Sequence, residues 1–530
     1  MRSFDSVICM TLLSASTLPE IAAANGDALS VPGYRLEDRT VGIVHFGVGG
    51  FHRAHQAYYL NRLFNAGHSA EWAVCGVGLM PGDAAMRDAL TSQDGLYTFA
   101  AKFPDGSREA SVIGSIAEYL FAPDDPEQVL ERMTDPAVRI VSLTVTEGGY
   151  NYNPSTGEFQ YETPAVAADL DADFSRDDSA LQAGSQPAHP QTMFGYVVEA
   201  LRRRREAGVG PFTVLSCDNV RGNGHLAKEM VLAFTRRKDE QAHAEPLAGW
   251  IEQNVAFPNC MVDRITPVTA EEDRAMVAED YGIEDAWPVV SEDFIQWVLE
   301  DDFPAGRPVF EEVGVQMVQD VEPYELMKLR LLNCSHQAIA YFGLLLGHTY
   351  AHEACTDPEL TPFTRFLYMD DEGTPTIPEV PGIDLEAYKD QLIARFANEH
   401  VKDTLARLAA ESSDRIPTWM MPVIRENLDA GRDVTVCAAI VASWARYAEG
   451  TGENGEQWPL VDRLRDRVMA AAAQHDQDPL AFLRDEELFG DLVQHEAFTA
   501  PYLEALQTLR TDGARALLQK LTADRLNARG

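Results

Sequence analysis

The chain has 530 residues, of which 45% are hydrophobic, enough for roughly two to four domains with large cores. Its 83 acidic residues outnumber its 43 lysines and arginines, so its formal net charge is -40 at pH 7. Such a field repels phosphate backbones and anionic lipid, so we expect neither nucleic acid nor a membrane as a partner. The charge is typical either of an ordinary solvated shell or of adaptation to high salt, and the presence of only seven lysines favours the second.

The N-terminal 26 residues contain Arg2, a short apolar run and three consecutive alanines, as a secretory signal does. The run is short and has Asp5 beside it, so we predict an ordinary N-terminal segment and a cytoplasmic protein. The seven cysteines are scattered without a C-x-x-C pair, which predicts neither a disulfide framework nor a zinc site. No later stretch approaches the roughly 18 apolar residues that a membrane span needs.

Between residues 41 and 147, short β-branched runs alternate with helical stretches, and the same alternation returns after residue 190. This order predicts right-handed βαβ crossovers and a mostly parallel sheet. The predicted strands are 41–47, 72–79, 138–145 and 212–219, and the predicted helices between them include 54–67 and 193–208. Residues 165–190, rich in Asp, Ser, Ala and Pro, are predicted to be an acidic surface insertion.

From about residue 290 the sequence changes character, because helix formers with 3.6-residue apolar spacing dominate and β-branched runs become rare. Predicted helices there include 324–347, 385–398 and 433–450. We therefore predict an α/β, Rossmann-like dinucleotide-binding domain over residues 1–290, followed by a largely α-helical substrate and catalytic domain over 291–530.

The segment "HFGVGGFHRAH" places Gly47, Gly49 and Gly50 after a predicted strand and before a predicted helix. Glycines there let the chain turn tightly and bring its backbone amides close to a pyrophosphate. His52 stands where the usual fingerprint has its third glycine, so the segment alone is as compatible with an ordinary tight turn as with nucleotide binding.

Asp83 is the acidic residue nearest the end of the second predicted strand. An acid in this region of a dinucleotide-binding domain binds the ribose hydroxyls of NAD. Asp83 is equally well placed to cap the helix that follows it. The first interpretation favours NAD, with NADP as the open alternative.

The segment "YELMKLRLLNCSHQAIAYFG" gathers Glu325, Lys328, Asn333 and His336 within an arc of roughly 140° if it is an α-helix. A lysine in low-dielectric surroundings can act as a base near neutral pH, and an asparagine amide can donate to a developing alkoxide. A water-facing polar stripe is the alternative, but the flanking residues are too apolar for a solvent helix. We therefore favour a catalytic face.

Two further polar groups follow short apolar runs. Asp218 and Asn219 end the predicted strand "FTVLSCDN", and Asp263 follows the run in "FPNCMVDRITP". The carboxyl ends of strands in open α/β sheets are where ligands bind. Each of these residues could equally be a turn residue that caps a backbone amide.

At these residues the chain resembles the polyol-specific long-chain dehydrogenases, also called the mannitol dehydrogenase family, from about residue 28 onward. The stretches that carry the resemblance are "GIVHFGVGGFHRAHQAYY", "VSLTVTEGGYN", "SCDNVRGNG", "FPNCMVDRITP", "EDFIQWVLED" and "KLRLLNCSHQAIAYFG". The resemblance implies reversible, metal-independent oxidation of D-mannitol to D-fructose with NAD as cofactor, by a monomer.

The resemblance also implies roles for individual residues. It makes Lys328 the general base, Asn219 and Asn333 the oxyanion donors, His336 the residue that positions substrate hydroxyls, and Glu325 the gate for proton exit. It implies a substrate site with Asp263, Arg407 and Arg415, and a cofactor site with Gly47, Gly49, Gly50, Phe51 and Asp83.

Three alternatives stay open. D-arabinitol could replace mannitol as the polyol. The chain could be a fructuronate or tagaturonate (mannonate) oxidoreductase, in which case Arg407 or Arg415 would bind the substrate carboxylate. It could also be a non-catalytic dinucleotide-binding sensor, although a sensor has no need of a lysine base together with two oxyanion donors.

Overall fold

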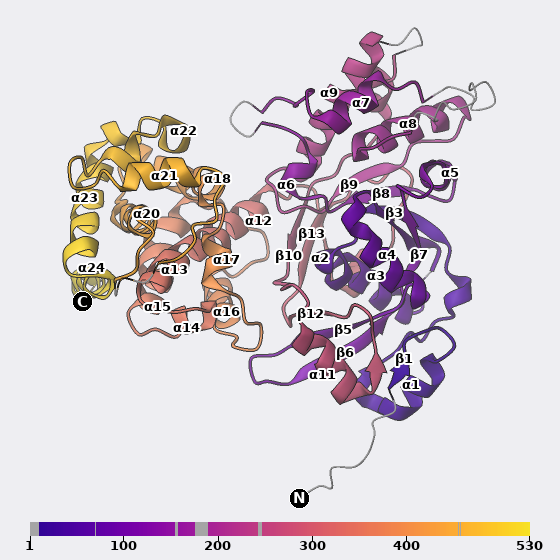
Figure 1. Ribbon diagram of the computed structural model, residues 1–530, viewed down its shortest axis with the longest axis horizontal. Coiled ribbons are helices and arrows are strands. Elements are labelled where there is room, and N and C mark those ends of the chain that lie inside the picture. Colours follow the sequence, from indigo (N-terminus) through magenta and orange to yellow (C-terminus); the bar gives the residue numbers. More distant parts are fainter. Residues whose placement is uncertain are drawn as a thin grey trace, which may run out of the picture. The chain divides into compact units, whose positions relative to one another are not determined.

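The computed structural model describes residues 10–68, 70–153, 157–174, 189–241, 246–453, 455 and 457–529. They form two compact units (Figure 1): the first holds the described residues up to Lys102 and Ser107–Val321, and the second holds Phe103–Gly106 and the described residues from Glu322 onward. The boundary falls at residue 321 and not at the predicted 290, because three short strands extend the sheets of the first unit. They are β12 (Val289–Glu292), β13 (Gln296–Glu300) and β14 (Gln316–Val318).

The first unit is built on a five-stranded parallel sheet with the order β7-β4-β3-β8-β9. Every residue of β3, β4, β8 and β9 is buried, as in parallel sheets covered on both faces. From β3 the chain builds outward first through β4 and β7, and then on the other side through β8 and β9. Ligands of such sheets bind where this order reverses, here beside the carboxyl ends of β3 and β8. The strands are β3 (Val41–Phe46), β4 (Ala73–Gly78), β7 (Ile116–Phe121), β8 (Ile140–Leu143) and β9 (Thr213–Ser216).

Helices of the first unit pack onto this sheet and complete its core. Phe46, Val77 and Leu143 of the strands form one buried cluster with Tyr196 and Phe234 of the helices. Apart from α1, the helices of the first unit are α2 (Gly50–Ala54), α3 (Gln56–Asn65), α4 (Ala84–Ser92), α5 (Pro126–Thr134), α6 (Thr146–Gly149), α7 (Pro164–Asp171), α8 (Met193–Glu206), α9 (Asn223–Gln241), α10 (Ala248–Asn254) and α11 (Glu271–Tyr281), of which α11 packs in a separate cluster near the N-terminus.

Helix α7 lies in the stretch predicted to be an acidic surface insertion. Its Val166 and Leu170, four residues apart, belong to the buried core. The Asp169 carboxylate is buried too, and it accepts hydrogen bonds from the backbone N–H groups of Gln191 and Thr192 at 2.7 and 2.8 Å. The predicted surface insertion is therefore wrong for the first part of residues 165–190, and residues 175–188 lie outside the described residues.

Smaller sheets complete the first unit, and the sequence did not predict them. A four-stranded sheet has the order β12-β5-β6-β2, in which β5 and β6 pair antiparallel, and a three-stranded sheet has the order β10-β13-β14. Near the N-terminus, β1 pairs with β11, and Leu13, Leu18 and Ile21 pack in a second buried cluster. The remaining bounds are β1 (Thr11–Leu12), α1 (Leu18–Asn25), β2 (Leu29–Ser30), β5 (Tyr97–Lys102), β6 (Arg108–Ile113), β10 (Cys260–Asp263) and β11 (Ile283–Glu284).

The second unit, drawn in orange to yellow in Figure 1, is helical as predicted. Three of its segments are π-helices: η7 (Lys328–Asn333), η8 (Phe363–Gly373) and η10 (Ile416–Met420). The longer α-helices are α13 (Cys334–Leu345), α16 (Leu385–Phe396), α19 (Met421–Asp429), α20 (Thr435–Tyr447), α21 (Arg465–Ala472), α23 (Glu496–Thr511) and α24 (Ala514–Arg529). Shorter ones are α12 (Glu322–Met327), α14 (Ala351–Ala354), α15 (Leu360–Pro362), α17 (Leu405–Ala409), α18 (Ser412–Arg415) and α22 (Glu486–Phe489). A membrane-crossing helix, long and apolar throughout, does not occur in the described part of the chain.

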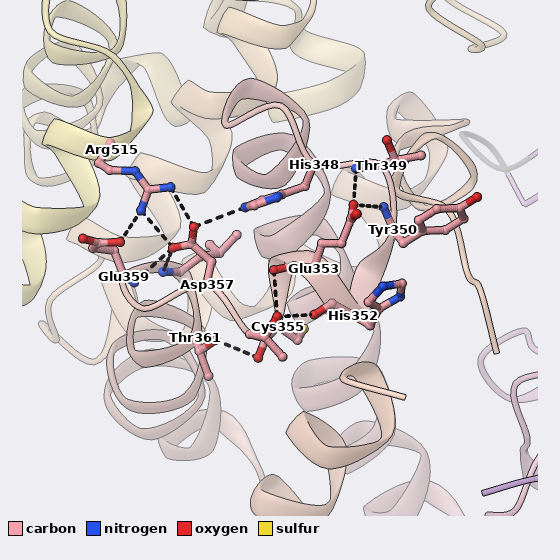
Figure 2. A network of polar contacts seen from close by, with 12 residues as sticks. His348, Thr349, Tyr350, His352, Glu353, Cys355, Asp357, Glu359, Thr361 and Arg515 are labelled. Atoms are coloured by element: carbon pink, nitrogen blue, oxygen red, sulfur yellow. Dashed lines mark hydrogen bonds and ion pairs between the residues drawn. The ribbon is translucent and has the colours of Figure 1, made fainter. Parts of the chain in front are cut away.

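An ion-pair network joins α24 to the segment around Asp357 in the same unit (Figure 2). Arg515, in the first turn of α24, donates to the buried Asp357 carboxylate at 2.7 Å and also pairs with Glu359. The His348 ring lies 3.2 Å from the same carboxylate. Burial alone would raise the pKa of Asp357, but Arg515, the backbone N–H groups of Leu360 and Glu359, and His348 together hold it well below its ordinary value.

We predict that Arg515→Ala lowers the free energy of unfolding by about 1–2 kcal/mol at pH 7, because Asp357 stays buried without its cation. A depressed carboxyl pKa stabilises the fold above its unfolded value and loses that contribution as pH falls. The deficit of the variant should therefore shrink below about pH 4. Urea unfolding at pH 7 and at about pH 3 measures both effects.

The matched control is Lys520→Ala on the same helix, which breaks an exposed ion pair with Glu504. We expect a change below about 0.5 kcal/mol, as is usual for surface pairs. An equal loss of unfolding free energy in the two variants would show that the ion pair of Arg515 with the buried Asp357 is no stronger than a surface pair.

Candidate functional site

The glycine turn after β3 has two glycines with different requirements. Gly47 has a φ of +93°, and a Cβ there would lie 2.0 Å from the Thr144 carbonyl oxygen, so the fold itself requires glycine. Gly49 has a φ of -101°, and among the described atoms a Cβ there would meet nothing closer than the Gly47 oxygen at 3.9 Å. The chain thus leaves open space at Gly49, where a ligand could approach the backbone.

Two stacked histidine rings lie between α2 and β3, where a third glycine would let the helix and the strand pack closely. The ring of His52, in α2, stacks on the ring of His45, in β3, with 3.5 Å between centroids. His45 Nδ1 lies 2.8 Å from Ser142 Oγ, and His45 Nε2 lies 2.9 Å from Thr144 Oγ1. Burial lowers the pKa of His45 to about 3 and that of His52 well below its ordinary value, so both rings are neutral spacers. The neighbouring Phe51 stacks on His55.

Asp83 lies just after β4, close to the sheet edge. Its Oδ2 accepts a hydrogen bond from the Met80 backbone N–H at 2.9 Å, across the short 3-10 turn Pro81–Asp83, and its side chain makes no capping hydrogen bond to α4, the helix that follows. A Cβ on Gly78, the last residue of β4, would come within 2.8 Å of the Asp83 Cβ. Asp83 therefore stands at the end of the second strand, and its contact with a ribose stays a prediction.

Asp218 joins the loops that follow β8 and β9. Its buried carboxylate accepts hydrogen bonds from the backbone N–H groups of Val145 and Thr146 at 3.1 and 2.8 Å, and from the Tyr150 hydroxyl at 2.6 Å. Thr146 has a φ of +63°, rare for a β-branched residue and common at functional sites. Burial raises the pKa of Asp218 to about 6. The sequence marked the strand end but did not reveal this role, which depends on partners some 70 residues away.

The exposed Asn219 follows Asp218 directly, so its backbone is fixed by this junction. The Asn223 side chain fixes it from the other side, donating to the Asp218 carbonyl at 3.0 Å and to the Cys260 carbonyl of β10 at 2.8 Å. Asp263 is the last residue of β10 and is buried. The structure thus places Asn219 at the same sheet edge as the glycine turn.

In the second unit the predicted catalytic face is interrupted by a π-helix. Glu325 lies in α12, Lys328 and Asn333 are the first and last residues of η7, and His336 lies in α13. The expected uninterrupted α-helix is therefore wrong at its centre. In an α-helix, residues five apart point about 140° from each other. A π-helix pairs residue i with i+5, so Lys328 and Asn333 come closer to one face than predicted.

The polar groups of this segment are buried. The exposed fractions of Glu325, Lys328 and Asn333 are 9%, 6% and 4%. In the described part of the chain, the Asn333 Oδ1 atom has no hydrogen-bond partner. Because buried polar atoms are almost always paired, the Asn333 amide is suited to a ligand or a bound water.

His336 lies among charged groups of the second unit. Burial lowers its pKa to about 3, Asp403 opposes this effect, and Arg407, Arg415 and Arg395 add to it. The ring is therefore neutral at working pH, able to donate one hydrogen bond and accept another. Its ring centroid lies 4.8 Å from that of Phe396.

The two predicted substrate arginines both contact protein groups. Arg407 donates through Nε and Nη2 to the two carboxylate oxygens of Asp403, at 2.6 and 2.5 Å. Arg415 donates through Nη1 to the Leu408 carbonyl at 2.8 Å and to the Arg407 carbonyl at 3.2 Å. The structure thus brings His336, Arg407 and Arg415 together and adds Asp403 to them, and their contact with a substrate stays a prediction.

Comparison with known families agrees with both units. The family description "Mannitol dehydrogenase Rossmann domain" matches residues 41–312, and "Mannitol dehydrogenase C-terminal domain" matches residues 320–510. The chain belongs to the mannitol dehydrogenase family. The resemblance found in the sequence is confirmed, and so is the fold class of a Rossmann-like domain followed by a helical one.

Individual relatives cover nearly the whole chain. A mannitol 2-dehydrogenase of Phaeosphaeria nodorum is 46% identical over 92% of this chain and 83% of its own length. One of Aspergillus fumigatus is 43% identical, covering 96% of this chain and 98% of its own. Among solved structures, the Pseudomonas fluorescens mannitol 2-dehydrogenase in ternary complex with NAD and D-mannitol is 39% identical, with a TM-score of 0.84 over 96% of this chain and 99% of its own. A substrate-free D-sorbitol dehydrogenase is 35% identical, with a TM-score of 0.83 over 96% of this chain and 100% of its own.

Proposed function

We propose that the protein is a polyol dehydrogenase that oxidises D-mannitol to D-fructose, reversibly and without a metal, with NAD as cofactor. The observation that carries this proposal is the π-helix that begins at Lys328 and ends at Asn333, with both side chains buried. A buried lysine is suited to taking a proton, and the N–H groups of a buried amide on the same short helix are suited to donating to the oxyanion left behind. The relatives named mannitol 2-dehydrogenase support the same reaction.

The first unit offers a site that fits a dinucleotide. Gly47 fixes the turn, and the open space at Gly49 would let a pyrophosphate approach the amides of Gly49, Gly50 and Phe51. Asp83, after the second strand of the sheet, would bind the adenosine ribose. When bound, NAD supplies the acceptor for the hydride that leaves the polyol carbon. The related mannitol 2-dehydrogenase structure with bound NAD and D-mannitol supports this choice of cofactor.

The residues of this chain would then handle the proton and the developing charge. Lys328 takes the proton of the C2 hydroxyl, while the side-chain amides of Asn219 and Asn333 donate to the alkoxide. The neutral His336 ring orients a neighbouring hydroxyl, because it can both donate and accept. Glu325 opens the exit for the proton from Lys328.

The substrate chain would be held by Asp263, Arg407 and Arg415. A neutral polyol fits these residues better than a uronate does. The Nε and Nη2 edge of Arg407 is already paired with the Asp403 carboxylate, and Arg415 Nη1 donates to backbone carbonyls, so a carboxylate that binds Arg407 would have to lie beside the charge of Asp403. Asp263 adds a further acidic side chain. Catalysis by a monomer in the cytoplasm stays a prediction.

The first test is the initial rate of NAD reduction with D-mannitol, D-sorbitol, D-arabinitol and D-mannonate, each at low and at molar salt. We expect the highest kcat/KM with D-mannitol, and activity that persists at molar salt if the acidic surface is an adaptation to it. A preference for D-mannonate would move the function to uronate metabolism, and an absence of turnover with all four would favour a sensor.

Asn333→Ala tests the oxyanion role. Removing one oxyanion donor lowers turnover by about 100- to 1000-fold, so kcat with D-mannitol should fall in that range while the fold is kept. The matched control is Ser335→Ala, which removes a buried hydroxyl that also has no partner in the described chain. Its turnover should stay within about threefold of the parent. A similar fall in both variants would mean general damage to this helix.

Gly47→Ala and Gly49→Ala separate the fold from the cofactor site. Gly47→Ala should lower the melting temperature strongly, because the new Cβ would clash with the Thr144 carbonyl. Gly49→Ala should leave melting nearly unchanged and raise the Kd for NAD by about tenfold, because only the ligand comes close to this position. Calorimetric NAD titration and thermal melts measure both. Unchanged NAD affinity in Gly49→Ala would remove the glycine turn from the cofactor site.

A further inference from the structure

Asp403 is a carboxylate whose side chain is dedicated to one arginine. It lies just before α17, and Arg407 lies one turn further, so the two can pair along the helix. Both carboxylate oxygens accept hydrogen bonds from Arg407, at 2.6 and 2.5 Å. The Asp403 side chain is 9% exposed, whereas that of Arg407 is 54% exposed. Asp403 is therefore the buried partner of the pair, and part of the Arg407 guanidinium remains exposed.

The backbone at Asp403 is held independently of its carboxylate. The Asp403 carbonyl accepts a hydrogen bond from Ala351 N–H at 2.9 Å, and Leu405 N–H donates to the Thr349 carbonyl at 2.9 Å. Thr404 pairs with Tyr350 in an isolated β-bridge. Nothing in this anchoring uses the Asp403 side chain, so its charge can be changed with little effect on the fold.

The pair lies in the environment of His336. Asp403, Arg407, Arg415 and Arg395 are the charged groups that act on the imidazole, and Asp403 is the one acid in that set. Without Asp403, three cations would surround the ring. Such a site would attract an anionic substrate, because a guanidinium binds a carboxylate through two parallel hydrogen bonds. With Asp403 in place, the donor pair on one edge of Arg407 is already used.

We infer that Asp403 determines specificity in this enzyme: by pairing with Arg407 it keeps the site selective for neutral polyols over the corresponding sugar acids. It is a positioning residue, because it acts through Arg407. A substrate hydroxyl can still accept from the remaining N–H groups of Arg407, whereas a substrate carboxylate would have to displace Asp403 or lie beside its negative charge. The inference rests on the proposed function, and it assigns the discrimination between polyol and uronate substrates to the ion pair of Asp403 with Arg407.

The test is the Asp403→Asn variant, which keeps the size and removes the charge. D-mannonate is used as a competitive inhibitor of D-mannitol oxidation, and its binding to the enzyme with NAD is also measured by calorimetry. We expect the ratio of the D-mannonate inhibition constant to the D-mannitol KM to fall at least tenfold relative to the parent. The effect should persist at molar salt, because the charge acts at contact distance, where screening is weakest.

Four further variants make the test specific. Asp403→Glu keeps the charge and should behave like the parent. Asp403→Asn combined with Arg407→Ala should lose the gain, because no freed guanidinium remains. Asp414→Asn removes an equal charge from neighbouring α18, where Asp414 pairs with Arg463 at 2.9 Å, and should leave the ratio unchanged. Asp403→Ser, measured alongside, provides a second neutral variant if the asparagine variant does not fold.

A ratio within twofold of the parent in a folded, neutral Asp403 variant would overturn the inference. So would an equal gain in Asp414→Asn, which would point to a general charge effect. Failure of the proposed function looks different: the parent would not oxidise D-mannitol at all. The calorimetric binding of D-mannonate would then still report whether Asp403 excludes carboxylates.

Discussion

The close approach of Gly47 to the backbone of Thr144 fixes the position of the glycine turn in the first unit. It joins the ends of β3 and β8, the two strands between which the order of the sheet reverses. The stacked rings of His45 and His52 keep α2 against the same place, and Asp218 fastens the loop after β8 to the loop after β9. One sheet edge thus receives the glycine turn, the strained Thr146 and Asn219. Small changes in strand packing here would move every group that we assign to the cofactor and the oxyanion.

In the second unit, the lysine and the amide that we propose as base and oxyanion donor, Lys328 and Asn333, are both buried. In an α-helix these two residues would point about 140° apart, at the two limits of the predicted face. The π-helix η7 removes much of that angle at the expense of poorer backbone hydrogen bonding. Two further segments of the same unit, η8 and η10, are also π-helices, so this departure from α-helical geometry is not confined to the proposed site.

The sequence predicted the parallel sheet because continuous apolar runs such as 41–47 and 138–145, separated by helical stretches, indicate strands that are buried on both faces. It missed β5 and β6, which contain alanines and charged residues, poor strand formers. These two strands pair with each other, but β5 also pairs with β12 and β6 with β2, both far away in the chain. The π-helix was missed because apolar spacing does not record which carbonyl an N–H group reaches. The roles given to the site residues stay predictions, and the sequence did not show that Asp218 and Asp403 make their contacts with other residues of the chain. Asp403 and Arg407 left a readable signal, an acid and a base four residues apart.

The pairing of Asp403 with Arg407 also bears on the large surface charge. A net charge of -40 repels all anions at low salt and could by itself keep sugar acids away. At molar salt, however, screening reduces the range of that field to about 3 Å, so distant surface carboxylates no longer discriminate. Only charges in direct contact with the substrate site keep their effect. If the acidic surface is an adaptation to salt, selectivity against carboxylates must be built into the site itself. The bidentate contact between Asp403 and Arg407 is of that kind, because its two hydrogen bonds act at contact distance, where screening is weakest.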